Sequence, residues 1–129
     1  MIVGVGIDLV DIARVQRLID GKGQRALDRL FTADEVAYAT SRARPAMHLA
    51  ARIAAKEAAF KALSGSDEAR RIGWREVEVI AQSGGAPRLE LHGRAQLRAR
   101  ELGVGRAHLS LSHTDTTAGA VVVLDRGGD

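Results

Sequence analysis

The stretch LAARIAAKEAAFKAL, residues 49–63, has the composition of a strong helix, yet it places charge among its apolar side chains. At about 100° per residue its larger apolar side chains form one stripe, made by Leu49, Ile53, Phe60 and Leu63. Lys56 falls inside that stripe and Glu57 lies on its edge. A charge among apolar side chains requires a partner, so we expect charged groups from elsewhere in the chain to meet this helix.

The flanks of this stretch predict where the helix begins and ends. We expect it to run from about Met47 to Ser64, with Gly65 as its stop, and a preceding helix to end before Pro45. Seven alanines between Ala50 and Ala62 permit close packing on several sides. The preceding helix begins at FTADE, residues 31–35, because Thr32 and Glu35 can form a capping box.

The amino-terminal segment MIVGVGIDLVD predicts a strand followed by a helix. Val3, Val5 and Ile7 alternate with glycines, and a glycine face lets another backbone or a neighbouring subunit approach closely. We expect the strand to end at Asp8, and Asp11 to cap a helix that runs to about Asp20 with a basic outer face.

The second half predicts a hairpin, a helix and a final pair of strands. Apolar and charged side chains alternate in residues 76–79 and 88–91, on either side of a turn at Ser83–Pro87, which predicts a hairpin. Residues 93–102 are predicted to be helical, and 106–112 to form a strand before a turn at 114–117. Together these elements predict an α+β fold, a single domain over residues 1–129 with a small antiparallel sheet packed on the long central helix.

Composition bounds the class of protein. The chain has 129 residues, 46% hydrophobic and 27% charged, and no cysteine, which excludes disulfides, thiolate metal sites and thiol catalysis. It shows neither a basic leader nor a long apolar run, so we expect a soluble, cytoplasmic protein. The net charge of +3 favours an acidic partner, while only four aromatic residues argue against a single-strand nucleic-acid binder.

Glu57 and Lys61 share a helix face, and this spacing has two interpretations. It can be an ordinary solvated ion pair. Alternatively, Glu57 binds a hard cation while Lys61 holds an anionic oxygen, and Asp8 supplies a second carboxylate. Asp8 by itself is more commonly explained as a turn-forming or capping residue.

Other candidates carry less information alone. His108, Ser110 and Ser112 share one face of their strand and His113 follows at its end, where it can bind a phosphate or stay passive. The glycines of the turn at 84–87 can approach a nucleotide or serve only the hairpin.

Taken in order, these motifs resemble the holo-acyl-carrier-protein synthase family of phosphopantetheinyl transferases. The matching stretches are GVGIDLVDIARV at 4–15, FTADE at 31–35, AARIAAKEAAFKAL at 50–63, GGAPRLELHGRA at 84–95 and LGVGRAHLSLSH at 102–113. The aspartate after the first strand, combined with Arg-x-x-x-Lys-Glu-Ala-x-x-Lys on the mid-chain helix, is the specific part. The family often has an aromatic residue at the position of Ile53, a lysine at Ala86 and Gly-Thr-Gly at 64–66.

The resemblance implies transfer of 4′-phosphopantetheine from coenzyme A to a serine of apo acyl carrier protein, leaving adenosine 3′,5′-bisphosphate. It implies that Asp8 and Glu57 hold magnesium and that Lys61 balances charge on the departing phosphate. The coenzyme A site would be lined by Arg52, Lys61, Gly65, Gly85, Pro87, Ser112 and His113. Three candidates remain for the base that deprotonates the serine: the first is a metal-bound water held by Glu57, the second is His113, and the third is Asp115.

The resemblance further implies that Arg14 and Arg17 meet the acidic recognition helix of the carrier. It also implies a homotrimer whose sites are shared between adjacent subunits, and a role in fatty acid biosynthesis and lipid metabolism. The alternative is a basic binding module without catalysis, which recognises nucleic acid or an acidic protein through Arg14, Arg17, Arg42 and Arg44.

Overall fold

The two ends of the chain meet in one antiparallel sheet. In the computed structural model, which describes residues 1–127, the first strand β1 (Ile2–Asp11) pairs with the last, β5 (Thr117–Asp125). On its other side β5 pairs with β4 (Arg106–His113), so the strand order is β1-β5-β4. The pairing between β1 and β5 continues to Asp11, opposite Thr117. The strand therefore passes through Asp8, and the prediction that it ends there was wrong.

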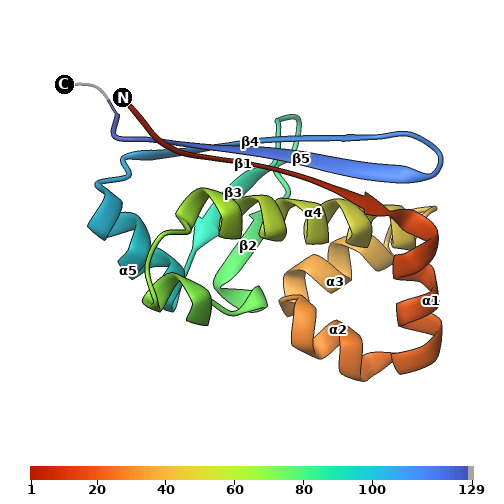
Figure 1. The fold of residues 1–129 in the computed structure, drawn as a ribbon. Helices are drawn as coiled ribbons and strands as arrows, with labels where there is room; N and C mark the ends of the chain where they lie inside the picture. Colours follow the sequence, from red (N-terminus) through yellow and green to blue (C-terminus); the bar gives the residue numbers. More distant parts are fainter. Residues whose placement is uncertain (128–129) are drawn as a thin grey trace.

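Helix α4 (Pro45–Leu63) lies across one face of this sheet (Figure 1). All seven of its alanines from Ala50 to Ala62 are buried. Gly4 and Gly6 allow this contact, because a Cβ on either would collide with a carbonyl oxygen of α4, that of Ala62 or that of Ala58. The backbone that approaches the glycine face of β1 is thus the central helix of the same chain.

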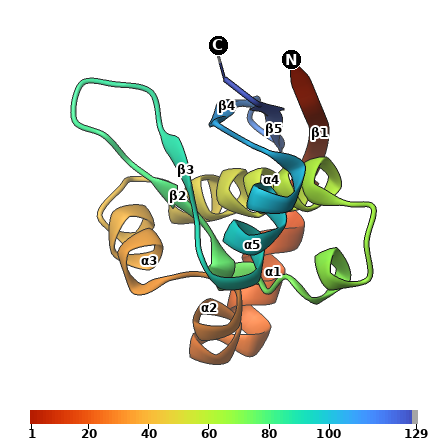
Figure 2. The same cartoon turned by 90° about the vertical axis from the view of Figure 1, so that its left-hand side faces the viewer.

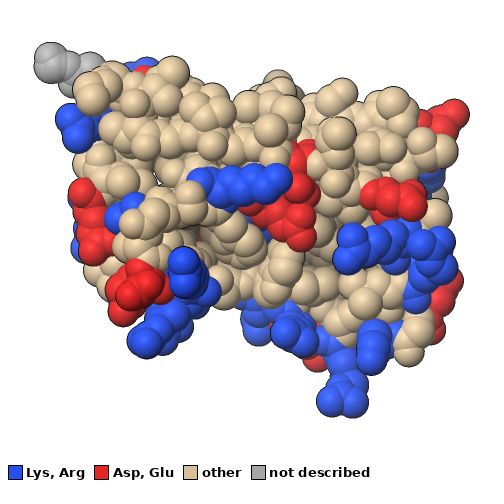
Figure 3. Space-filling model, viewed as in Figure 1, with Lys and Arg blue, Asp and Glu red and all other residues tan. Residues whose placement is uncertain are grey.

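The opposite face of the sheet carries an apolar row. Val5, Ile7 and Leu9 of β1 are 58%, 60% and 72% exposed, and all the helices lie on the other side of the sheet (Figure 1). In the same view Lys and Arg gather over the helices, while the surface over the sheet is mostly uncharged (Figure 3). We call Val5, Ile7 and Leu9 the β1 row.

The remaining elements pack on the far side of α4, which Figure 2 shows between them and the sheet. They are α1 (Ile12–Lys22), α2 (Gln24–Leu30), α3 (Ala33–Thr40), the paired strands β2 (Val77–Ile80) and β3 (Arg88–Leu91), and α5 (Gly93–Leu102). Two short 3-10 helices, Glu68–Arg71 and Trp74–Glu76, connect α4 to β2. None of the helices among residues 1–127 has the length and apolar character to cross a membrane.

Lys56 finds its partner in Glu35. The Lys56 Nζ lies 2.9 Å from the Glu35 carboxylate, with both side chains fully buried, and it also donates to the carbonyl of Trp74 at 2.9 Å. Glu35 completes the predicted capping box with Thr32 and accepts the amide of Val79 at 2.9 Å. The Glu35 carboxylate therefore caps α3, neutralises the ammonium of Lys56 on α4 and holds β2 through a backbone hydrogen bond.

The structure confirms the α+β fold with a small antiparallel sheet on a long central helix. The structure also matches the prediction at the caps of α1 and α3 and at the end of α4 before Gly65. It matches as well in the β2–β3 hairpin and in α5. Helix α2 was missed. It has only seven residues, and one of them, Ala26, is buried, so its apolar pattern is weak.

Candidate active site

Asp8 and Glu57 meet between β1 and α4. Asp8 belongs to the same inward face of β1 as Gly4 and Gly6, so its side chain points at the helix and is 13% exposed. Its Oδ1 accepts a hydrogen bond from Lys61 Nζ at 3.1 Å, and the same ammonium donates to the carbonyl of Ile7 at 2.8 Å. Two carboxylates and one ammonium are thus held together by residues about fifty positions apart.

The electrostatics of this trio suit a cation. Burial, then a hydrogen bond with Asp8 and repulsion from its carboxylate, raise the pKa of Glu57 from 4.5 to about 7, although Arg14 and Lys61 lower it. Asp8 Oδ2 is buried without a hydrogen-bond partner within the described part of the chain. A buried free oxygen beside a second carboxylate fits a hard divalent cation, which coordinates oxygen ligands of this kind.

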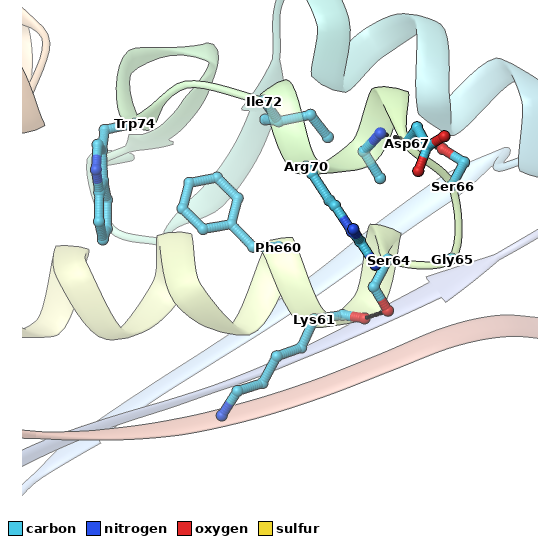
Figure 4. A pocket seen from close by; sticks show the side chains of 10 residues that line it. Phe60, Lys61, Ser64, Gly65, Ser66, Asp67, Arg70, Ile72 and Trp74 are labelled. Carbon is cyan, nitrogen blue, oxygen red and sulfur yellow. Dashed lines mark hydrogen bonds between the residues drawn. The ribbon is translucent and has the colours of Figure 1, made fainter.

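Lys61 also borders a cavity of about 800 Å³, the Lys61 cavity (Figure 4). Phe60 and Trp74 form its apolar end, with ring centroids 5.2 Å apart in an edge-to-face arrangement. Gly65 and Arg70 belong to its polar wall, with Ser64, whose hydroxyl donates to the carbonyl of Lys61 at 2.7 Å. The cavity offers cationic and hydroxyl groups beside Lys61 and an apolar surface further away.

A second, smaller cavity of about 240 Å³ contains most of the other predicted coenzyme residues, and we call it the Arg52 cavity. Its lining includes Arg52, Gly85, Pro87, Ser112 and His113. Arg52 is 3% exposed, lies 4.4 Å from the centre of the Tyr38 ring and leaves its Nε unpaired within the described residues. A buried guanidinium with a free donor is a strong candidate for binding an anion.

The surroundings of this cavity are electropositive. Burial is the main reason why the pKa of His48 is lowered, and its neighbours Arg52, Arg42, His113 and Arg44 lower it further. His113 Nδ1 lies 3.1 Å from the carbonyl of Thr114 at the end of β4. The Arg52 cavity therefore favours a negatively charged ligand.

The Lys61 and Arg52 cavities lie on different sides of α4. Nine positions separate Arg52 from Lys61, which at about 100° per residue is about two and a half turns and places the two side chains on opposite sides of the helix. The strand order agrees, since Asp8 lies on one edge strand and Ser112 on the other. The predicted site residues thus form two groups in one chain: Asp8, Glu57, Lys61 and Gly65 in the first, and Arg52, Gly85, Pro87, Ser112 and His113 in the second.

A third hollow, of about 480 Å³, includes Glu57 in its lining, and we call it the α1 groove. Its apolar lining includes Leu18, Leu30 and Ile53, while Arg14 and Arg17 supply basic side chains. Trp74 lines both this groove and the Lys61 cavity, so the two are neighbours. The sequence prediction missed Trp74, Arg70 and His48; a tryptophan that occurs once in the chain was the available signal.

Comparison with known proteins gives one consistent result. The family model of the 4′-phosphopantetheinyl transferase superfamily matches residues 4–120. A holo-[acyl-carrier-protein] synthase of Moorella thermoacetica is 47% identical over 120 residues, which are 93% of this chain and 91% of the relative. Among solved structures, the holo-[acyl-carrier-protein] synthase of Neisseria meningitidis has 30% identity and a TM-score of 0.84, over 97% of this chain and 99% of that one.

A structure of the Bacillus anthracis holo-(acyl-carrier-protein) synthase in complex with CoA (3′,5′-ADP) is also similar. It has 31% identity and a TM-score of 0.76, with 96% of each chain covered. Nearly the whole fold therefore has a counterpart in these proteins.

Proposed function

The chain belongs to the 4′-phosphopantetheinyl transferase superfamily, and from this membership we propose that it is a holo-acyl-carrier-protein synthase. Residues 1–129 then act as one transferase domain. A serine hydroxyl of the apo carrier attacks the phosphorus that bears pantetheine in coenzyme A. The serine O–P bond forms, the P–O bond to the second phosphate breaks, the serine proton passes to a base, and adenosine 3′,5′-bisphosphate leaves.

The meeting of Asp8, Glu57 and Lys61 is the observation that carries this proposal. Asp8 and Glu57 would hold the divalent cation, for which we propose Mg²⁺, and this ion supplies neutralisation of the pyrophosphate charge when bound. Lys61 adds a positive charge beside the departing phosphate, because its ammonium is already held over Asp8 while remaining 57% exposed. We assign Lys61 and Glu57 as catalytic residues on this geometry.

Coenzyme A also needs the Arg52 cavity in this proposal. Its buried guanidinium and electropositive lining suit a phosphate. Gly85 and Pro87 line the same cavity, where the nucleobase of coenzyme A could lie against them. Ser112 and His113 supply further polar contacts there. His113 belongs to the proposed catalytic set through its place in this cavity. The base for the serine stays open between a metal-bound water held by Glu57, the His113 side chain and the Asp115 side chain.

A site made by two copies of the chain would bring the residues of the Lys61 cavity together with those of the Arg52 cavity. Since α4 holds Arg52 and Lys61 on opposite sides, the Lys61 cavity of one subunit would face the Arg52 cavity of the next. The β1 row offers an apolar surface for such an assembly. We propose a homotrimer, in which each copy contributes to two sites.

The α1 groove is the proposed docking place of the carrier. Its apolar floor suits one face of a helix, and Arg14 and Arg17 suit acidic side chains beside that face. Because Glu57 lines the groove, a carrier docked there would bring its serine near the proposed reacting phosphate. A cytoplasmic role in fatty acid biosynthesis is consistent with this partner and with the absence of cysteine.

The test is the mass of the carrier. Apo acyl carrier protein should gain one phosphopantetheine only when the enzyme, coenzyme A and Mg²⁺ are all present. Glu57→Gln should lower the rate by at least roughly 10²-fold, the scale of losing one electrostatic group from a transition-state site, while its circular dichroism spectrum is unchanged. A basic binding module would leave every carrier unmodified and show salt-sensitive retention on nucleic acid that is indifferent to Glu57→Gln.

A further inference from the structure

A second group of metal-ligand side chains lies on the β2–β3 hairpin, away from Asp8 and Glu57. Glu78, Glu90 and His92 each place one ligand atom within 4.8 Å of the others. Glu78 and Glu90 are direct partners across the ladder of β2 and β3. Two carboxylates in that position repel each other, so a positive charge beside them is favourable.

Both carboxylates are already oriented by donors behind them. The Thr32 hydroxyl donates to Glu78 Oε2 at 2.7 Å, and Arg88 Nη1 donates to Glu90 Oε2 at 3.1 Å. The other oxygens face the imidazole, with His92 Nε2 lying 3.0 Å from Glu78 Oε1 and 3.6 Å from Glu90 Oε1. Outer hydrogen bonds that fix the ligand oxygens in this way are typical of metal centres.

We propose that Glu78, Glu90 and His92 bind a divalent transition-metal ion of the zinc class. One imidazole nitrogen with two carboxylate oxygens suits Zn²⁺, whereas Mg²⁺ prefers oxygen ligands alone. Ligands about 2.0–2.1 Å from a tetrahedral ion lie about 3.3 Å apart. The separations of His92 Nε2 from the two carboxylate oxygens, 3.0 and 3.6 Å, bracket that value, and the two oxygens lie within 4.8 Å of each other. The ion takes the place of a proton on His92 Nε2.

The position of the site indicates a structural role. The Glu78 side chain is 10% exposed, whereas Glu90 and His92 are 41% and 43% exposed, so an ion can enter from solvent and be fixed against a buried carboxylate. The ion would join β2, β3 and His92, the residue that precedes the first turn of α5. Binding to the folded chain alone would raise its stability by mass action.

The test uses the full chain after removal of metals with EDTA, titrated with Zn²⁺ in a buffer containing excess Mg²⁺. We expect one Zn²⁺ to bind per chain by calorimetry, with a rise in Tm that Mg²⁺ alone does not produce. Co²⁺ in place of Zn²⁺ should give the visible absorption of a tetrahedral complex. Loss of outer-shell bonds alone weakens metal binding about 10- to 100-fold. His92→Gln and Glu90→Gln, each at an exposed ligand, should therefore weaken Zn²⁺ binding at least tenfold.

Two control variants separate this site from other zinc ligands. His108→Gln removes an exposed histidine of β4, and Glu57→Gln changes the carboxylate beside Asp8; both should bind Zn²⁺ as the wild type does. The proposal is overturned by absence of saturable binding, by binding that survives His92→Gln and Glu90→Gln, or by binding lost in Glu57→Gln. A Tm that does not respond to Zn²⁺ would likewise show that the cluster binds no ion.

Discussion

At the scale of single residues, the site depends on charges that the fold forces together. Glu57 faces Asp8 across the β1–α4 contact, with Lys61 on the other side of the aspartate. Two neighbouring carboxylates repel each other unless a proton or a cation lies between them. The repulsion that destabilises this pair of carboxylates would therefore also favour binding of the proposed cation.

This repulsion predicts how stability depends on pH without divalent cations. Burial and the Asp8 carboxylate raise the pKa of Glu57 to about 7 in the folded chain, against 4.5 in the unfolded one. Between these values the folded state keeps a proton that the unfolded state has released, so Glu57 makes stability fall as pH rises from about 4.5 to 7. Urea denaturation in EDTA should show this slope in the wild type and its reduction in Glu57→Gln.

The two lysines of α4 provide a matched pair of substitutions. Lys56→Met leaves the Glu35 carboxylate buried without its partner, which should lower the free energy of unfolding by about 3–5 kcal/mol. Lys61→Met, in the same helix but at an exposed position, should cost about 0–1 kcal/mol yet reduce carrier modification strongly. Chemical denaturation and the carrier mass assay measure the two effects. Equal loss of stability in both variants would contradict the structural role of Lys56.

At the scale of elements, β1 and α4 are fitted to each other by small residues. The glycines of β1 face the alanines of α4, so the two backbones approach more closely than larger side chains would permit. Asp8, on the same face of β1, then meets Glu57 and Lys61 on the helix. The close packing of these two elements thus sets the spacing of the site.

A pair of glycine substitutions tests this packing. Gly6→Ala places a Cβ against the carbonyl oxygen of Ala58, a backbone atom that moves only if α4 shifts, so we expect a loss of about 1–3 kcal/mol or more. Gly21→Ala, in α1 with no atom within 4 Å of the new Cβ, should raise stability by about 0.5–1 kcal/mol. Thermal denaturation of both variants checks the prediction; a neutral Gly6→Ala would contradict it.

At the scale of the whole molecule, one chain holds the residues predicted to bind coenzyme A in two separate cavities. The sheet leaves its outer face, with the β1 row, on the side away from every described helix. This apolar surface and the separated cavities lead to the same proposal, assembly of several copies into complete sites.

The assembly can be tested at the β1 row. Ile7→Lys introduces a charge into a surface that the proposed assembly buries, so it should shift the protein toward monomer and lower activity at dilute concentration. Leu97→Lys changes an equally exposed leucine on α5 and should leave the mass of the assembly unchanged. Sedimentation velocity measures both. Dissociation by Leu97→Lys but not by Ile7→Lys would place the interface elsewhere.

Local signals in the sequence determined most of the elements. The Thr32–Glu35 capping box, Pro45, Gly65 and the turn at 84–87 act within a few residues, which is why they predicted the helices and the hairpin. The resemblance named Asp8, Glu57 and Lys61 before any geometry was known. The short helix α2 escaped because seven residues carry little periodicity.

Only the tertiary structure decided what depends on register and on distant contacts. It paired β1 with β5 to its last residue, joined Glu35 to Lys56, and brought Asp8 to Glu57. It also divided the residues predicted to bind coenzyme A over two sides of α4 and brought Glu78, Glu90 and His92 together. These contacts join segments far apart in the chain, and their geometry follows from how whole elements pack, which no local pattern of residues encodes.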